Sequence, residues 1–345
     1  WLVILVGFLA ISVKVWLFGD RLPQSSAAVP IQHAVSLHKD GIFGPATADA
    51  SGTPAPAMFY SPLYMAFAAG AMELDQGLTR SLTCLARAAN PEQALKCKTA
   101  LRPFYLVQAL ILALVPFFAW LMTWQLSGRK AFAWGAVLLV LLSGRPAAYA
   151  TGFSTDVLTL PLFAALLLSL VVAIQSRFWL WFVATGLACG LLALTEPDYA
   201  WVFYGLLPVL AYWRAAHEQN SRWFWITLAT LALPYLVVTG PWMWRNYLHF
   251  DTAVLSQGYI ASLLAERLAW NSMTILEVAV SFVHSLGGIG PDLAASAYPE
   301  DGWRRLVPGA ADGLYQTGDA MARQVMAAAG SAENQPGYLF AEKIW

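Results

Sequence analysis

The 345-residue chain is 59% hydrophobic and only 12% charged, and its formal net charge is zero. Because soluble domains carry about a quarter charged residues, this composition excludes an ordinary soluble domain and predicts a membrane protein. The balanced charge leaves no strongly basic face, so we expect no nucleic-acid partner.

Apolar runs along the chain predict transmembrane helices, since a span needs roughly 20 mostly apolar residues. The runs lie at about 1–18, 103–125, 130–145, 157–175, 178–195, 198–213 and 222–243. A weaker run at 274–288 contains Glu277 and His284, and it predicts an interfacial, re-entrant or poor final span. The chain begins at Trp1 and stops at Trp345, and we expect that further segments precede and follow it.

Basic residues in the short loops predict the orientation of these spans. Arg129 with Lys130, Arg177, and Arg214 with Arg222 mark every second short loop as cytoplasmic. The alternate connections are then external, namely 19–102, 144–156, 195–199 and the chain after 244. We therefore expect the chemistry of the protein on its outer face.

The long external loop, 19–102, contains its own predicted elements. The stretch "IQHAVSLHKDGIF" predicts a short amphipathic helix that ends at Asp40-Gly41, and "FYSPLYMAFAAGAMEL" predicts an aromatic-rich helix in the membrane interface. Cys84 and Cys97 lie in this loop, and an oxidising compartment would favour a disulfide between them. Cys189 lies inside an apolar run and is predicted to pack as a small hydrophobic residue.

Four stretches carry a family resemblance, and each falls on the predicted outer face. They are "HAVSLHKDGIFGP…MFYSPLYMAFAAG" (33–70), "SGRPAAYATGFSTDVLTLPLFAALLL" (143–168), "ATGLACGLLALTEPDYAWV" (184–202) and "PWMWRNYLHFDTAVLSQGY" (241–259). In this order they resemble GT-C glycosyltransferases, whose relatives include dolichyl-phosphate-mannose protein mannosyltransferases and bacterial aminoarabinose transferases of lipid A. The likeness fades after residue 260.

The resemblance implies an all-α, polytopic transmembrane fold, with a GT-C-like domain over 1–260 and an external or interfacial segment over 261–345. It also implies transfer of a sugar from a polyprenyl-phosphate donor to an acceptor on the external face, commonly assisted by Mg²⁺ or Mn²⁺. A bacterial inner membrane with a periplasmic first loop is the localisation that it suggests. The partners would be the lipid-linked sugar and membrane lipids.

Sugar transfer requires a carboxylate that accepts or orients the acceptor proton and a cationic site for the leaving phosphate. The family's first-loop acid would fall near Ser25 or Ser26 here, where the sequence has no carboxylate. Asp20 lies several residues earlier and is the candidate catalytic base. Its alternative role is that of a membrane-boundary acid paired with Arg21.

Asp156 matches the second-loop acid of the family and is a candidate for acceptor or metal binding. Alternatively, "S-T-D-V" at a helix start offers Ser154, Thr155 or Asp156 as a cap, and both roles can hold together. Glu196 is a candidate for the substrate groove. Since it flanks a proline together with Asp198, an ordinary helix N-terminus explains it equally.

Arg245, in "PWMWRNY", is the candidate ligand for the donor phosphate, because a guanidinium can chelate phosphate through two nitrogens. The alternative is a stop-transfer arginine held among interfacial tryptophans. Tyr60 and Tyr64 are candidates for an acceptor or lipid-tail groove, with an aromatic belt as the simpler interpretation.

Two other functions remain open at this point. The missing acid near Ser25 favours a GT-C-like scaffold that has lost catalysis and serves as a structural subunit beside other membrane proteins. Proline-interrupted spans also allow a transporter, although the sequence shows no inverted repeat and no intramembrane charge pair.

Overall fold

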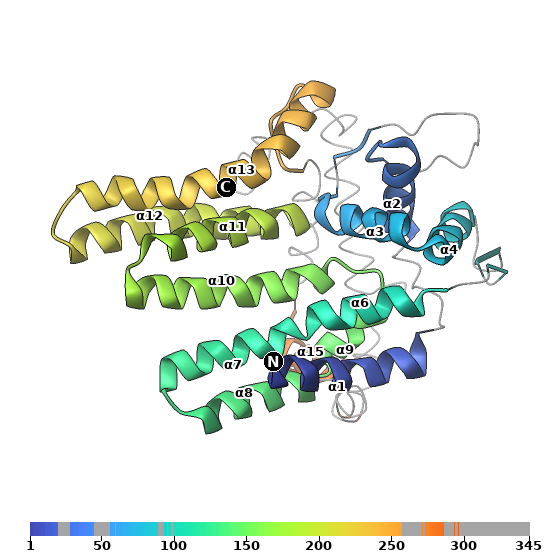
Figure 1. The fold of residues 1–345 in the computed structure, drawn as a ribbon, viewed down its shortest axis with the longest axis horizontal. Coiled ribbons are helices and arrows are strands. Elements are labelled where there is room, and N and C mark those ends of the chain that lie inside the picture. The colour runs from blue at the N-terminus through green and yellow to red at the C-terminus, as the bar shows by residue number, and fades with distance from the viewer. Residues whose placement is uncertain are drawn as a thin grey trace. The chain divides into compact units, whose positions relative to one another are not determined.

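A computed structural model describes residues 1–19, 28–44, 56–58, 60–88, 93–94, 96–97, 100–256, 271, 273–285, 293 and 296. The chain divides into two compact units, Trp1–Leu255 and Ser256–Trp345, which are considered separately. Every regular element in the described part of the chain is an α-helix (Figure 1). The all-α class predicted from the sequence is therefore confirmed for these residues.

Each predicted span contains a helix. These helices are α1 (Leu2–Phe18), α6 (Arg102–Leu112), α7 (Leu114–Ser127), α8 (Lys130–Leu142), α10 (Asp156–Ser176), α11 (Trp179–Thr195), α12 (Tyr199–His217) and α13 (Arg222–Phe250). Within the described residues three helical stretches are long and apolar enough to cross a membrane: Arg102–Ser127, Asp156–Ser176 and Arg222–Phe250. At 1.5 Å per residue, a helix of some 20 residues matches the roughly 30 Å of a bilayer core.

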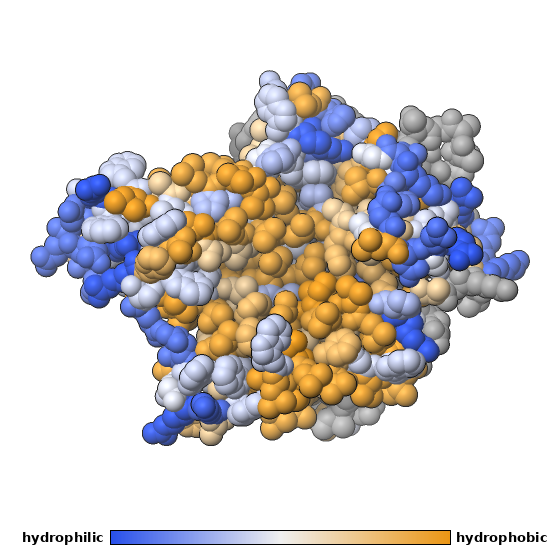
Figure 2. All heavy atoms as spheres, viewed as in Figure 1, coloured by the Kyte–Doolittle hydropathy of each residue, from blue (hydrophilic) through white to orange (hydrophobic). Residues whose placement is uncertain are grey.

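The surface of the first unit supports a membrane setting. Figure 2 shows hydrophobic residues gathered across the middle of the visible face, between hydrophilic residues at its ends. Leu233 and Val237 of α13 are 61% and 71% exposed, and Val209 of α12 is 61% exposed. Exposing such apolar side chains to water is unfavourable, whereas contact with lipid tails carries no such cost.

The external loop adds three helices to the first unit, α2 (Ala28–Asp40), α3 (Leu63–Leu74) and α4 (Gln76–Arg87). The predicted end of α2 at Asp40-Gly41 is confirmed, and Gly41 adopts a left-handed φ of 65°. The helix predicted over the aromatic-rich stretch is also present as α3. Neither α4 nor the short α9 (Arg145–Ala150) was expected from the sequence.

Two hydrophobic clusters hold the first unit together. One gathers buried residues of α1, α2, α3, α4 and α6, and the other gathers those of α10 to α13. Cys189 is 1% exposed in the second cluster, which confirms its predicted packing role. In that cluster α11 and α13 approach so closely that a Cβ added to Gly186 would lie 2.3 Å from the carbonyl oxygen of Leu231.

The helices of the second cluster have chemically different ends. At one end Arg214 donates to the carbonyl oxygen of Arg177 over 2.8 Å, and the Arg177 guanidinium lies 3.6 Å from Glu218. We call this the basic end. Because α10 begins at Asp156 and ends beside Arg177, Asp156 lies at the opposite end, which faces the same way as the turn between α11 and α12.

In the second unit, α15 (Ile275–Ser285) lies within the weak apolar run 274–288. The start of this helix accounts for the presence of Glu277 in that run. The Glu277 carboxylate accepts from the Thr274 amide over 2.6 Å, and the Thr274 hydroxyl accepts from the Glu277 amide over 3.2 Å. This reciprocal pair is a capping box, so Glu277 marks the start of the helix.

Candidate functional site

Two of the predicted site acids, Asp156 and Glu196, come together at the end opposite the basic end. The Thr155 hydroxyl donates to Glu196 Oε1 over 2.8 Å, and the Ser154 hydroxyl donates to Asp156 Oδ2 over 2.6 Å. One acid thus opens α10 and the other closes α11, with Thr155 between them. Both are partly buried, and we call them the acidic pair.

Capping is carried out by Ser154 and not by the Asp156 carboxylate. Thr155 occupies the N-cap position of α10 without a side-chain cap hydrogen bond. The Ser154 hydroxyl accepts from the Asp156 amide over 3.2 Å. The capping alternative therefore holds for the segment, while the Asp156 carboxylate remains suited to a ligand.

A buried polar contact supports the loop that leads into the acidic pair. Tyr64 is 1% exposed, and its hydroxyl lies 2.9 Å from the side-chain amide of Gln108. With the amide oriented to satisfy both of its ends, Gln108 accepts from Tyr64 and donates to the carbonyls of Ala150 (3.2 Å) and Gly152 (3.0 Å). These hydrogen bonds from the buried Gln108 hold the backbone at Ala150 and Gly152 in place.

The burial of Tyr64 corrects both interpretations of that residue made from the sequence. A side chain enclosed by the core, with its ring against Phe153 at 5.7 Å, lines neither a lipid-tail groove nor an aromatic belt. Tyr60 differs, because it is partly exposed and its ring meets His33 edge-on at 5.4 Å. The groove role predicted for Tyr60 stays a prediction.

The charges around the acidic pair act on one another. Burial raises the pKa of Glu196, the negative charges of Asp156 and Asp198 raise it further, and the hydrogen bond from Thr155 opposes them. Burial also raises the pKa of Tyr149 on α9, as does Asp156, whereas Arg145 lowers it by charge and by a hydrogen bond. Arg145 and Tyr149 therefore border the same site.

Arg245 lies elsewhere in the hydrogen-bond network and binds main chain. Its guanidinium donates to the carbonyls of Ala57 over 2.8 Å and Phe43 over 3.1 Å. It also donates to Asn246 Oδ1 over 2.9 Å and lies 4.7 Å from the centroid of the Trp242 ring. Arg245 thus fastens two segments of the external loop to α13, and its phosphate-binding role stays a prediction.

Asp20, Ser25 and Ser26 lie outside the described residues, so the role of Asp20 as catalytic base stays a prediction. Among the residues that are described, no group of three or more His, Cys, Asp or Glu side chains is placed to hold a metal ion. The oxygens of the acidic pair are nevertheless the hard ligands that Mg²⁺ and Mn²⁺ take, since these ions are commonly bound through one or two carboxylates plus substrate phosphates.

The sequence interpretation missed Gln108, Tyr149 and Arg145 as parts of this region. Gln108 was open to detection, because an amide well inside the apolar run 103–125 must find buried partners. Tyr149 and Arg145 lie on the unexpected helix α9 and gave no comparable signal. The predicted disulfide is present, with the Cα atoms of Cys84 and Cys97 5.8 Å apart.

Comparisons of the chain with protein-family models, with curated proteins and with solved structures found no match. A function must therefore be argued from the residues themselves. Those residues define a site at one end of an apolar helical bundle, on a loop supported by Tyr64 and Gln108. There Thr155 donates to Glu196, Ser154 donates to Asp156, and the two carboxylates are close enough to interact electrostatically.

Proposed function

We propose that the protein is a membrane glycosyltransferase that moves a sugar from a polyprenyl-phosphate donor to an acceptor hydroxyl. The observation that carries the proposal is the acidic pair at the end of the bundle away from the basic end: Thr155 binds Glu196, and the neighbouring Asp156 carboxylate acts on Glu196 through its charge. The resemblance of residues 1–260 to GT-C enzymes supports it, because that family keeps an acid where Asp156 lies.

The different surroundings of the two acids suggest different roles. The raised pKa of Glu196 makes it the better proton acceptor. In the proposed reaction Glu196 takes the proton of the acceptor hydroxyl, the acceptor oxygen bonds to the anomeric carbon of the sugar, and the lipid phosphate leaves with the bonding electrons. Asp156 orients the acceptor and would hold Mg²⁺ or Mn²⁺, which would supply positive charge opposite the leaving phosphate.

The proposal includes a location. The proposed location is a bacterial inner membrane with the external loop in the periplasm. The Cys84–Cys97 disulfide favours an oxidising compartment for that loop, because disulfides persist there. The helices suited to span a membrane support the same setting.

The acidic pair can be tested by substitution in the purified protein. With polyprenyl-phosphate sugars, candidate acceptors and Mn²⁺, release of free polyprenyl phosphate should fall by about 100-fold or more in Asp156→Asn and in Glu196→Gln. Glu218→Gln removes a carboxylate at the basic end and should leave turnover unchanged. Equal turnover in all three variants, each with unaltered thermal unfolding, would remove the acidic pair from the mechanism.

One observation favours a second function, that of a GT-C-like scaffold without catalysis. Arg245, the cation predicted to bind the donor phosphate, already donates to two main-chain carbonyls and to Asn246. Under this alternative no donor is turned over, and the protein purifies as a stoichiometric subunit of a larger membrane complex. Turnover by the isolated chain would contradict it.

A further inference from the structure

A cavity opens on the helices of the external loop. It has a volume of about 580 Å³, and its lining includes Lys39, Arg80, Arg87, Thr83 and the Cys84–Cys97 disulfide. None of its lining residues belongs to the acidic pair or to the contact between Tyr64 and Gln108. The cavity is thus independent of the site proposed for sugar transfer.

Three cations from two helices converge on this cavity. Lys39 comes from the last turn of α2, while Arg80 and Arg87 come from the middle and the end of α4. Burial and the charge of Arg87 lower the pKa of Lys39, and Asp40 only partly opposes them. Among the described residues none of the three cations forms an ion pair with a carboxylate.

Ordinary helix electrostatics explains part of this arrangement. A cation in the last turn of a helix interacts favourably with the helix dipole, and this accounts for Lys39 and Arg87 taken one at a time. It does not account for Arg80, which lies away from the end of α4. Nor does it explain why like charges from separate helices line one cavity, since their mutual repulsion favours an anion between them.

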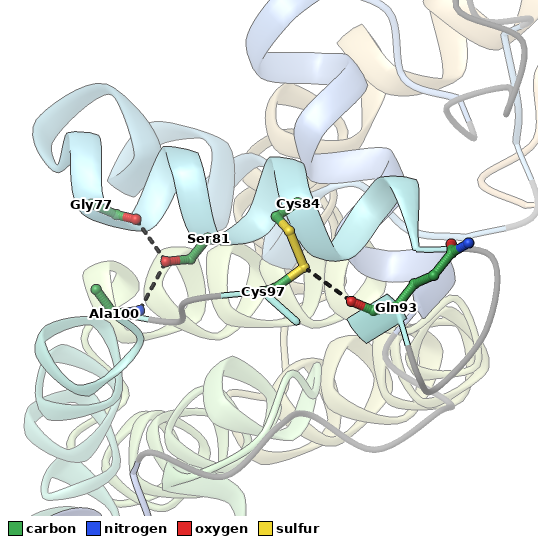
Figure 3. Close-up of a disulfide and its surroundings, with 6 residues drawn as sticks. All are labelled: Gly77, Ser81, Cys84, Gln93, Cys97 and Ala100. Atoms are coloured by element: carbon green, nitrogen blue, oxygen red, sulfur yellow. Dashed lines mark hydrogen bonds between the residues drawn. A yellow bond between two sulfur atoms is a disulfide. The ribbon is translucent and has the colours of Figure 1, made fainter. Parts of the chain in front are cut away.

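The wall of the cavity is braced by several contacts. Ser81 donates to the carbonyl of Gly77 over 2.7 Å and accepts from the Ala100 amide over 2.8 Å, and the disulfide joins α4 to the turn at Cys97 (Figure 3). Across the helix pair, the Gln32 side chain donates to the carbonyl of Ala86 over 3.4 Å. The cations are thus presented by a fixed frame, which lowers the entropy lost on binding.

The Thr83 side chain also lines the cavity. The Thr83 hydroxyl oxygen is buried and makes no hydrogen bond within the described part of the chain. A buried hydroxyl without a partner carries a free-energy penalty of about 1–3 kcal/mol, so a ligand oxygen that reaches it would gain a contact. Guanidinium, ammonium and hydroxyl donors together match the oxygens of a phosphate group.

We propose that this cavity binds a phosphate-bearing ligand, with the phosphate between Lys39, Arg80 and Arg87. Its volume falls in the range of pockets that hold small ligands, which leaves room for part of whatever carries the phosphate. The carrier is either a lipid headgroup at the membrane surface or a soluble phosphorylated molecule. Both offer anionic phosphate oxygens, and the experiment below separates them.

The test uses the full chain in nanodiscs of zwitterionic lipid. In one arm inorganic pyrophosphate is titrated and followed by calorimetry, and in the other anionic phosphatidylglycerol replaces part of the lipid while the thermal unfolding midpoint is measured. We expect a response in at least one arm, weakened by about tenfold or more in the double variant Lys39→Ala/Arg87→Ala and weakened less in Arg80→Ala. Lys96→Ala removes an exposed cation of the same loop that does not line the cavity, and it should leave the response unchanged.

A response to pyrophosphate that depends on Lys39 and Arg87 supports a soluble phosphorylated ligand, and a response confined to phosphatidylglycerol with the same dependence supports a lipid headgroup. The proposal is overturned by no response in either arm, or by a response that the double variant shares with the parent. A variant that fails to fold is replaced by Lys39→Gln/Arg87→Gln, which removes both charges but keeps part of each aliphatic stem. Sugar transfer by Asp156 and Glu196 can fail or succeed independently of this result.

Discussion

His33 is a titratable group buried in an aromatic setting. It is 2% exposed, and its ring meets Phe43 at 4.8 Å and Tyr60 at 5.4 Å. Burial, together with the nearby charge of Arg245, lowers the pKa of His33 from 6.5 to about 4. The folded protein therefore keeps this imidazole neutral at pH values where the unfolded chain protonates it.

Because the pKa of His33 is lower in the folded than in the unfolded state, the stability of the protein depends on pH in this range. Between pH 6.5 and about 4 the unfolded state binds the proton and the folded state does not, so the free energy of unfolding falls as the pH falls. The loss is about 1.4 kcal/mol per pH unit, or roughly 3 kcal/mol over the interval. We expect His33→Phe to remove most of this dependence, measured as the unfolding midpoint at pH 7 and pH 5.

The exposed His249→Phe is the matched control, and its midpoint should fall with pH as that of the parent does. If His33→Phe and the parent lose stability equally between pH 7 and pH 5, then another group carries the acid sensitivity.

Asp198 offers a way to examine Glu196 without touching it. The charge of Asp198 helps to raise the pKa of Glu196, so Asp198→Asn should lower that pKa. If Glu196 is the proton acceptor, activity declines as the pH falls through its pKa, and the acid limb of the pH–rate profile should shift to lower pH in the variant. Asp251→Asn, at the exposed C-terminal end of α13, serves as the control. An unmoved acid limb would assign the base role to another residue.

Among the helices, the packing of α11 on α13 depends on the absence of a side chain. Gly186→Ala would place a methyl carbon 2.3 Å from the carbonyl oxygen of Leu231, and the backbones would have to separate. We expect a loss of about 1–3 kcal/mol of unfolding free energy, measured by thermal unfolding in one detergent.

Gly205 in α12 provides the opposite case, because an added Cβ there meets nothing within 4 Å. Gly205→Ala should be neutral or more stable by up to about 1 kcal/mol, since alanine favours helix. A similar change in unfolding free energy in both variants would show that the close approach of α11 to α13 does not govern the effect at Gly186.

Most of the helices recovered from the sequence have apolar runs longer than a dozen residues, and α2 was recovered from its amphipathic pattern. Helix α4 escaped because its apolar residues, Leu78, Leu82 and Leu85, are separated by polar ones. Their spacing of four and three residues was a usable signal, as was Asp75, whose carboxylate accepts from the amides of Gly77 and Leu78. The helical spacing of these leucines could therefore have predicted α4, although the segment is only moderately hydrophobic.

The candidate site was recoverable only as separate residues. Asp156 and Glu196 were each nominated by local pattern, yet their connection through Thr155 spans 41 positions of sequence and depends on how α10 lies against α11. The binding of Arg245 to the carbonyls of Phe43 and Ala57 depends in the same way on the fold. Such contacts arise from the packing of distant elements, which no short sequence window contains.

For the molecule as a whole, the orientation in the membrane follows from the contrast between its ends. Basic residues in the short loops predict that the basic end faces the cytoplasm, and the disulfide-bearing helices then lie outside. Asp40 and Ser221 are exposed positions, one on α2 of the external loop and one preceding α13. We expect a membrane-impermeant maleimide to label Asp40→Cys in spheroplasts and to label Ser221→Cys only after permeabilisation.

The native cysteines do not interfere with this measurement, because Cys84 and Cys97 are bonded to each other and Cys189 is buried. The parent chain without an introduced cysteine is the blank. Labelling of Ser221→Cys alone in intact spheroplasts would invert the proposed orientation and place the acidic pair on the cytoplasmic side.

The contacts of Arg245 join segments that are synthesised at different times. Its guanidinium closes on Ala57, 188 positions earlier, and on Phe43, 202 positions earlier. At a synthesis rate of about 5–20 residues per second, those carbonyls leave the ribosome roughly 10–40 seconds before their donor does. The contacts that hold Phe43 and Ala57 to α13 can therefore form only after α13 has been synthesised, and until then chaperones, oxidants and proteases can act on these two segments before that anchor exists.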